Sequence, residues 1–250
     1  MLADPAAILA TMTQAIALLG RDYTRLGPLG AVALPSGGAL ALSRGQEPKP
    51  YRYVDPNEDA ALIVRDEAGV LLAVADGYNG VAASELAIEA VRSAARELLS
   101  EDPSRFAAEL ERVLAELSPE LGRVGPSRTC LLVASLVGDR CLYACFGDSA
   151  LYRASQPGPV SAATGAFLGP GLVLDGATRS AVLGGFERTH AERVALVTDG
   201  VVNFLQEPNG LSALLASELD DVECARAVAR AAMRGGAGDN VAVALFSGPA

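Results

Sequence analysis

Short apolar segments separated by polar turns run through most of the chain and predict an antiparallel β-structure. Residues 30–43 hold two apolar segments around a Pro-Ser-Gly-Gly turn, and residues 60–75 hold two more around the turn at 66–69. Each pair has the pattern of a β-hairpin. Hairpins require antiparallel neighbours, so the pattern disfavours an alternating βαβ sheet. Further strands are predicted at 129–137, 141–146, 150–153, 194–198 and 241–246.

Apolar residues also recur with helical spacing. Two helices are predicted between the second hairpin and residue 129, and a third runs from a capping-box-like start at Asp220 to Arg234. An N-terminal helix is predicted over residues 5–19, where one apolar face would be formed by Ile8, Met12, Ile16 and Leu19.

Together these elements predict one α+β domain over residues 1–250, with two antiparallel sheets covered by helices. We expect residues 1–27 to form a helical N-terminal extension. Residues 155–192 are rich in Gly and Pro and have weak periodicity, so we expect an irregular, flap-like segment there.

Composition and charge narrow the class of protein. Half of the 250 residues are hydrophobic, which excludes an intrinsically disordered chain. A formal net charge of −10 argues against a nucleic-acid partner. No apolar run reaches the roughly 18 residues needed to cross a bilayer, and the first residues lack the pattern of a secretory signal. We therefore expect a cytoplasmic protein with no membrane partner.

Cysteine and histidine usage disfavours two common kinds of active site. The four cysteines form no C-x-x-C pair and are expected to be buried, reduced thiols. His190 is the only histidine, so both a zinc site and a Ser-His-Asp triad are improbable. The chain also lacks the glycine-rich phosphate loops of nucleotide-binding proteins.

Aspartates recur where apolar strands begin or end. A single Asp-Gly step is most simply a hairpin turn. Carboxylates at the ends of several strands can instead converge at one rim, where their repulsion favours a bound cation. An all-oxygen set favours a hard cation such as Mg²⁺ or Mn²⁺. The acidic segments are Asn57-Glu58-Asp59, Asp76-Gly77, Asp148-Ser149, Asp199-Gly200 and Asp239-Asn240.

In their order and spacing, these segments and the strand from Thr129 resemble the PPM family of metal-dependent protein Ser/Thr phosphatases, also called type 2C. The resemblance covers about residues 30–248. It implies a four-layer α-β-β-α sandwich of two antiparallel sheets flanked by helices. It also implies hydrolysis of phosphoserine and phosphothreonine in proteins by a hydroxide that bridges two Mn²⁺ or Mg²⁺ ions. The partner would be a phosphorylated protein, within a Ser/Thr kinase system.

The resemblance also implies roles for individual residues. Asp76 would bridge two metals, with the Gly77 carbonyl on the second. Asp199 and Asp239 would hold the first metal, and these two with Asp76 would be the catalytic residues. Glu58 and Asp59 would bind waters of the second metal or ligate it. Similar bacterial members hold a third, more weakly bound ion with the residues that match Asp148 and Asp199.

The sequence departs from the family pattern near the substrate. Val54 stands near the usual position of a phosphate-binding arginine, which leaves Arg52 and Arg128 as candidates for that role. Asn79 replaces a glycine after the bridging aspartate, and Asn tolerates left-handed backbone. Tyr78 stands where some members have a histidine acid. These departures keep open a pseudophosphatase or regulatory module that binds metal or partners with little turnover, and a globular domain whose Asp-Gly steps are only turns.

Overall fold

The computed structural model describes residues 13–161, 163–164, 167–169, 181–189, 192–205 and 210–248. One group of strands is β1 (Gln14–Leu19), β4 (Ala60–Arg65), β5 (Val70–Tyr78), β6 (Arg128–Val137), β7 (Arg140–Phe146) and β9 (Val182–Glu187). A second group is β2 (Leu29–Ala33), β3 (Ala39–Ser43), β8 (Ala150–Arg153), β10 (Val194–Val197) and β11 (Val241–Phe246). The helices are α2 (Ala82–Ser93), α3 (Ala95–Leu98), α4 (Pro103–Leu121), α5 (Asp199–Val202), α6 (Gly210–Leu215) and α7 (Asp221–Arg234), with a 3-10 turn η1 at Gly20–Asp22.

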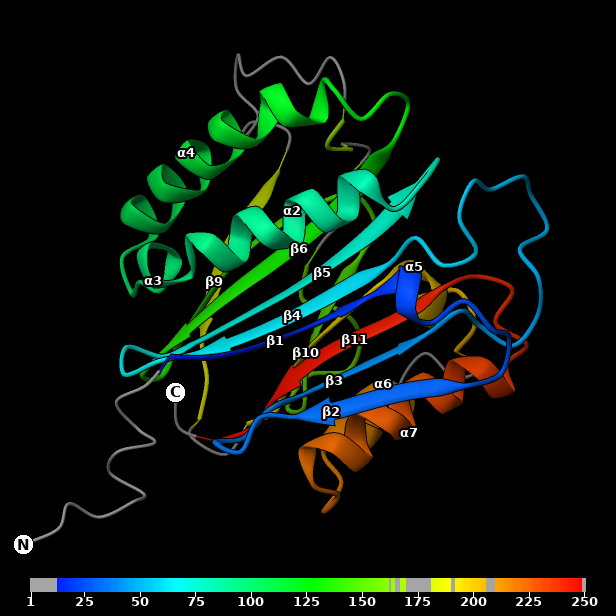
Figure 1. Ribbon diagram of the computed structural model, residues 1–250. Helices are drawn as coiled ribbons and strands as arrows, with labels where there is room; N and C mark the ends of the chain where they lie inside the picture. The colour runs from blue at the N-terminus through cyan, green and yellow to red at the C-terminus, as the bar shows by residue number, and fades with distance from the viewer. Residues whose placement is uncertain are drawn as a thin grey trace, which may run out of the picture.

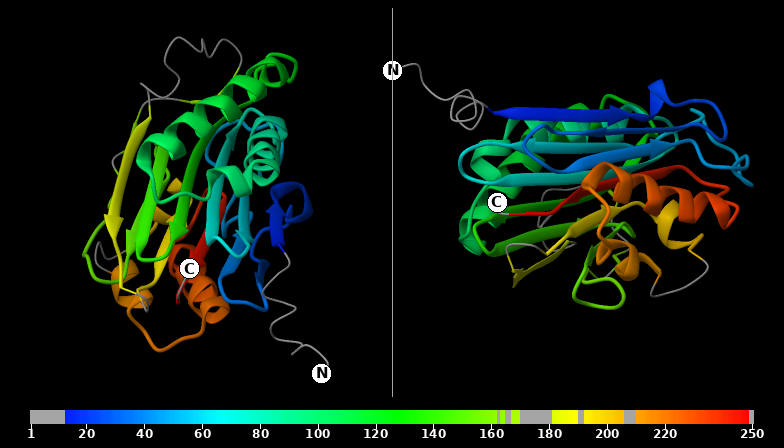
Figure 2. Two further views of the ribbon diagram at one scale, coloured as in Figure 1. Left: turned by 90° about the vertical axis from the view of Figure 1, so that its left-hand side faces the viewer. Right: turned by 90° about the horizontal axis from the view of Figure 1, so that it is seen from below.

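The strands form two antiparallel sheets that stack between two layers of helices (Figure 1). One sheet has the order β1-β4-β5-β6-β7-β9 and the other β2-β3-β11-β10-β8. Helices α2, α3 and α4 cover the outer face of the first sheet, and α7 with α6 covers the outer face of the second (Figure 2). This arrangement confirms the α-β-β-α sandwich that the sequence predicts.

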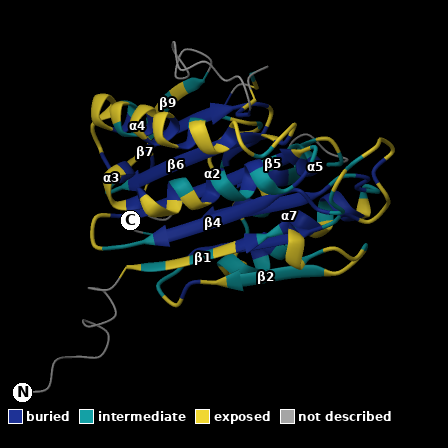
Figure 3. Cartoon of the chain, turned by 45° about the horizontal axis from the view of Figure 1, so that its top comes forward, coloured by how far each residue is buried: buried dark blue, intermediate teal, exposed yellow. Residues whose placement is uncertain are grey.

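The central strands are apolar on both faces because each face meets another layer. In β4, Leu62 points to the helices while Ile63 points to the opposite sheet. In β11, Val243 packs on α7 and Phe246 lies between the sheets. Successive side chains of these strands therefore point to opposite faces, but both faces are apolar. Figure 3 shows the result, with buried strands between helices whose outer faces are exposed.

The predicted N-terminal helix is wrong over its described part. Residues 14–19 form β1, which pairs with β4 from Gln14↔Arg65 to Leu19↔Ala60. Ile16 and Leu18 pack into the layer between the sheets. The pairing satisfies backbone groups along the edge of β4, which an N-terminal helix would leave open, and this tertiary gain outweighs the local helical spacing. Residues 1–12 of the predicted extension lie outside the described residues.

The described part of the predicted irregular segment at 155–192 contains a strand. This strand is β9, which pairs with β7 from Cys145↔Val182 to Arg140↔Glu187. Two consecutive glycines hide this strand in the sequence. Tyr143 fills the space that a side chain at Gly184 would occupy, because a Cβ built there would lie 2.4 Å from the tyrosine ring. An aromatic side chain on the neighbouring strand thus compensates for the missing one.

The other predicted elements are confirmed with small shifts of their ends. At the start of α7, the Asp220 carboxylate accepts a hydrogen bond from the backbone N–H of Glu223 over 2.8 Å, as a capping residue does. Over the described ranges, none of the helices combines the length and the apolar character that a bilayer crossing demands.

Candidate active site

Four of the predicted carboxylates meet in one pocket at a common end of the two sheets. Asp76 comes from the end of β5, and Asp148 from the link between β7 and β8. Asp199 follows β10 and begins α5, and Asp239 precedes β11. The pocket has a volume of about 380 Å³ and is lined by Tyr51, Arg52, Asp76, Gly77, Tyr78, Asp148, Phe167, Asp199 and Asp239.

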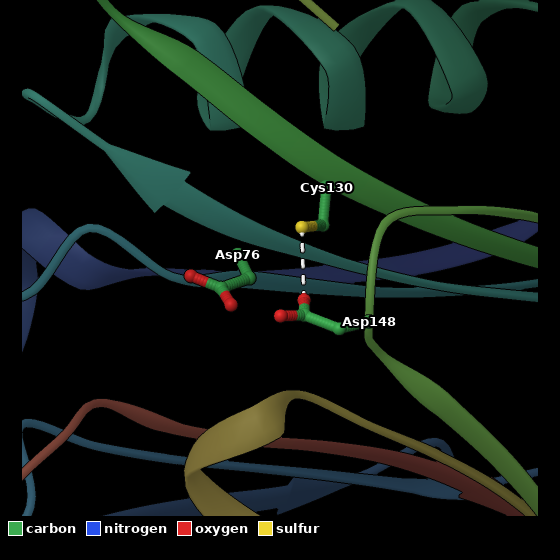
Figure 4. A group of neighbouring side chains, drawn as sticks. All are labelled: Asp76, Cys130 and Asp148. Carbon is green, nitrogen blue, oxygen red and sulfur yellow. Dashed lines mark hydrogen bonds between the residues drawn. The ribbon is translucent and has the colours of Figure 1, made fainter. Parts of the chain in front are cut away.

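Asp76 and Asp148 of this pocket form a compact group with Cys130 (Figure 4). Each offers one ligand atom, and these atoms lie within 4.8 Å of one another. Asp76 and Cys130 are cross-strand partners on β5 and β6, and the Cys130 thiol donates to Asp148 Oδ1 over 3.1 Å. Burial raises the pKa of this thiol, so Cys130 is a neutral donor at physiological pH. All four cysteines are free and buried, as the sequence predicts.

The other two predicted metal residues, Glu58 and Asp59, lie behind the pocket wall. Glu58 Oε1 accepts hydrogen bonds from the backbone N–H groups of Gly80, Asp55 and Val54 over 2.5, 3.3 and 3.4 Å. Asp59 Oδ2 accepts from the Thr198 hydroxyl over 2.8 Å. Both side chains hold loops together in this structure, and their role as metal ligands stays a prediction.

Asn240 ties the two acidic loops together. Its Oδ1 accepts the backbone N–H of Glu58 over 2.9 Å, and its Nδ2 donates to the carbonyls of Arg44 and Pro56 over 3.1 Å each. The segment after Asp239 therefore fixes the segment before β4, although about 180 residues of sequence separate the two. This places Asp239 and Asp59 in one charged cluster.

Crowding of buried carboxylates disfavours their ionised forms. Burial, and then the neighbouring aspartates, raise the pKa of Asp76 well above its usual range. Burial raises the pKa of Asp59 to about 8, with Lys49 opposing the rise. The pKa of Asp199 rises to about 6 because of burial and then Asp239 and Asp148. A cation inside the cluster would favour the charged forms.

One cation of the chain already lies in this cluster. The Lys49 ammonium is 3.1 Å from Asp239 Oδ1 and 3.3 Å from Glu58 Oε2, and its side chain is only 3% exposed. The Tyr51 hydroxyl donates to Asp239 Oδ2 over 2.7 Å. Burial and this hydrogen bond raise the pKa of Tyr51 above its usual value. Lys49 and Tyr51 therefore engage both oxygens of Asp239.

The departures from the family pattern have clear structural outcomes. Asn79 has φ 61°, so it takes the left-handed conformation expected for it, and it is the non-glycine residue with positive φ in the described part of the chain. Val54 is 66% exposed and gives no cation to the site. Of the two predicted phosphate-binding arginines, Arg52 lines the pocket. Arg128 is not among the described residues that line the pocket, and the Arg128 side chain packs beside Gly169.

The donor set fits divalent cations that prefer oxygen ligands. Four aspartates and the backbone of Gly77 face one pocket, and the described basic side chains form no ion pair with Asp76, Asp148 or Asp199. Mg²⁺ and Mn²⁺ bind such carboxylates and carbonyls. A Cβ at position 77 would lie 2.2 Å from the Glu58 carbonyl, so only glycine fits at this point of the wall.

Three residues of the site escape the sequence reasoning. Lys49, Tyr51 and Cys130 lack the strand-end pattern that identifies the aspartates. The one available signal is that Lys49 is the single lysine of a chain whose other basic residues are arginine, and that it stands between two prolines. His190, the single histidine of the sequence, lies outside the described residues.

Comparisons with known proteins concern the family and the fold of the chain. A family model described as "Protein phosphatase 2C" matches residues 51–233. A search of curated proteins finds no match. Among solved structures, PppA, described as a key regulatory component of T6SS in Pseudomonas aeruginosa, aligns with a TM-score of 0.64 at 18% identity over 89% of this chain and 99% of its own.

Two structures described as the phosphatase PstP are similar in the same way. The Mycobacterium tuberculosis serine/threonine phosphatase PstP/Ppp aligns with a TM-score of 0.65 at 19% identity, over 89% of this chain and 99% of its own. The catalytic domain of PstP in complex with two manganese ions aligns with a TM-score of 0.60 at 19% identity, over 88% and 97%. At these identities the likeness concerns the fold.

Proposed function

The chain belongs to the protein phosphatase 2C family, and from that premise we propose that it hydrolyses phosphoserine and phosphothreonine in proteins with Mn²⁺ or Mg²⁺. The single observation that supports this best is the convergence of Asp76, Asp148, Asp199 and Asp239 on one pocket from both sheets. Such a set has no evident use in a domain whose Asp-Gly steps are only turns.

The proposed metal residues are those that the family resemblance implies. Asp76 would contribute to two ions, with the Gly77 carbonyl on the second, Asp199 and Asp239 would hold the first, and Asp148 with Asp199 would hold a third. When bound, such ions would supply Lewis acidity, which would favour ionisation of a water nucleophile and neutralise the charge of the phosphoryl group. Glu58 and Asp59 would bind waters of the second ion or ligate it.

The residues of the chain perform the remaining tasks. Arg52 lies at the pocket and can bind a phosphate with its guanidinium fork. Tyr78 is 50% exposed and lines the same pocket, and we assign it no proton transfer. Phe167 borders the same pocket and can pack on the substrate chain. We propose a single domain in the cytoplasm, opposed by a Ser/Thr kinase.

A second candidate function also has structural support. Lys49 and Tyr51 engage both oxygens of Asp239, and Val54 gives no phosphate-binding arginine. A pseudophosphatase that binds a metal or a phosphoprotein with little turnover would have these features.

The two candidates differ in release of phosphate. We expect Mn²⁺-dependent release of phosphate from phosphoserine and phosphothreonine peptides, abolished by EDTA. Asp76→Asn should lower the rate at least about 1,000-fold, as loss of a group central to electrostatic stabilisation does. Asp66 is a half-buried turn residue that follows the end of β4, and its carboxylate accepts the Ala68 backbone N–H over 2.7 Å. Asp66→Asn is the matched control and should retain the rate. Binding of Mn²⁺ or phosphopeptide without any phosphate release would reject the enzyme and favour the pseudophosphatase.

A further inference from the structure

Lys49 is the chain's single lysine and lies inside the acidic cluster. It comes from the polar, proline-rich segment 46–56, whose neighbouring residues Pro48 and Pro50 are exposed. The segment turns this one side chain inward, where its ammonium contacts Asp239 and Glu58 and lies 5.5 Å from the centre of the Tyr51 ring. An ammonium has three donors and no acceptor, so it cannot itself ligate a metal.

The charges around the pocket are therefore distributed unevenly. On the Asp239 side, an ammonium and a phenol hydroxyl already bind the carboxylate. On the other side, Asp76 and Asp148 have no basic partner in the described part of the chain, and Cys130 gives only a neutral donor to Asp148. A divalent ion at Asp239 must lie close to the Lys49 charge or displace it, whereas an ion at Asp76 and Asp148 meets no such competitor.

We propose that Lys49 is a built-in cation that competes with a divalent metal ion for Asp239. The ion that contacts Asp239 is then bound more weakly than it would be without Lys49. This inference concerns the metal centre of the proposed function and rests on it. It assigns Lys49 as a positioning residue that sets how many ions the site holds at a given metal concentration.

Calorimetric titration with Mn²⁺, without substrate, tests the proposal. Lys49→Met keeps a long side chain and removes the charge. We expect it to bind Mn²⁺ at least about tenfold more tightly than the wild type, or to bind one more ion per chain, within the range of ordinary coupling between two sites. Arg44→Met is the matched control, since it removes a charge near the same loop whose partners, the Thr24 carbonyl and the Tyr53 hydroxyl, are neutral.

The outcomes of this titration are decisive. Equal or weaker Mn²⁺ binding by Lys49→Met with unchanged stoichiometry would overturn the proposal. So would an equal gain in Arg44→Met, since that gain would reflect net charge alone. If the wild type binds no Mn²⁺, the proposal survives only when Lys49→Met does bind it.

A second measurement uses the unmodified chain, in case Lys49→Met does not fold. Lys49 and the α-amino group are the two amines of the protein, so acetylation followed by mass spectrometry reports Lys49 against an internal reference. We expect saturating Mn²⁺ to raise Lys49 acetylation several-fold relative to the α-amino group, because the ion displaces the ammonium from Asp239. An unchanged ratio would overturn the proposal. Neither experiment contains substrate, so a chain that behaves as expected here and releases no phosphate refutes the enzyme alone.

Discussion

Replacing Asp199 by Asn should stabilise the metal-free protein although it removes a carboxylate from the proposed site. Burial, followed by Asp239 and Asp148, raises the pKa of Asp199 from 3.8 to about 6 in the folded state. The folded protein therefore binds this proton more tightly than the unfolded chain does. The resulting loss of stability is negligible well below pH 3.8, grows as pH rises towards 6, and is constant above it.

The structure gives the size of the effect. The difference between 3.8 and about 6 corresponds to about 3 kcal/mol of unfolding free energy above pH 7, and to about 0.5 kcal/mol at pH 4. Asp199 also begins α5, and a helix N-terminus favours its charge by roughly 0.5 kcal/mol. The Asn203 side chain donates to Asp199 Oδ2 over 2.9 Å, and the Asn oxygen can keep this bond. The net gain is about 2–3 kcal/mol at pH 8.

Urea denaturation in EDTA at pH 4 and pH 8 measures the gain. We expect Asp199→Asn to exceed the wild type by about 2–3 kcal/mol at pH 8 and by less than about 1 kcal/mol at pH 4. Asp22→Asn, an exposed acidic residue, is the control and should match the wild type at both pH values. The reasoning is refuted if Asp199→Asn is less stable than the wild type at pH 8, or if its gain is the same at both pH values.

Two further predictions follow from the pocket wall. Arg52→Ala should raise KM for a phosphopeptide about tenfold with a smaller effect on kcat, whereas Arg128→Ala should leave KM unchanged. Steady-state kinetics with saturating Mn²⁺ checks this. A raised KM in Arg128→Ala and not in Arg52→Ala would assign phosphate binding to Arg128 instead. Asn79→Ala should lower the unfolding free energy by about 1 kcal/mol because of its φ of 61°, while Asn79→Gly should cost nothing; urea denaturation checks this, and equal stability of the two variants would contradict it.

The sequence predicts those parts of the fold in which the turn or cap and the apolar segment beside it are neighbours along the chain. The hairpin of β4 and β5 is of this kind, and so is α7 with its Asp220 cap. The strands at the edges of the first sheet are not. β1 has helical spacing, and β9 contains Gly184 and Gly185, so each is a strand because of the neighbour that it pairs with. Pairing between distant segments has no local signal.

The same distinction applies to the site. Aspartates at strand ends can be predicted because buried strands fix their own ends, and Asp76, Asp199 and Asp239 meet as that argument requires. Lys49 and Tyr51 come from a segment without periodicity, whose path depends on contacts such as those of Asn240 with the Arg44 and Pro56 carbonyls. A sequence pattern cannot supply that path.

The carboxylates of the pocket come from both sheets. Asp76 belongs to one sheet, and Asp199 and Asp239 adjoin strands of the other, so the separations between their carboxylates depend on how the two sheets are aligned. Sliding one sheet by a single residue, about 3.3 Å, would exceed the tolerance of any coordination sphere. The apolar layer between the sheets, which includes Val74 and Leu132, therefore sets the distances between these carboxylates. Substitutions in this layer can change these distances and so slow the reaction without altering any charged group.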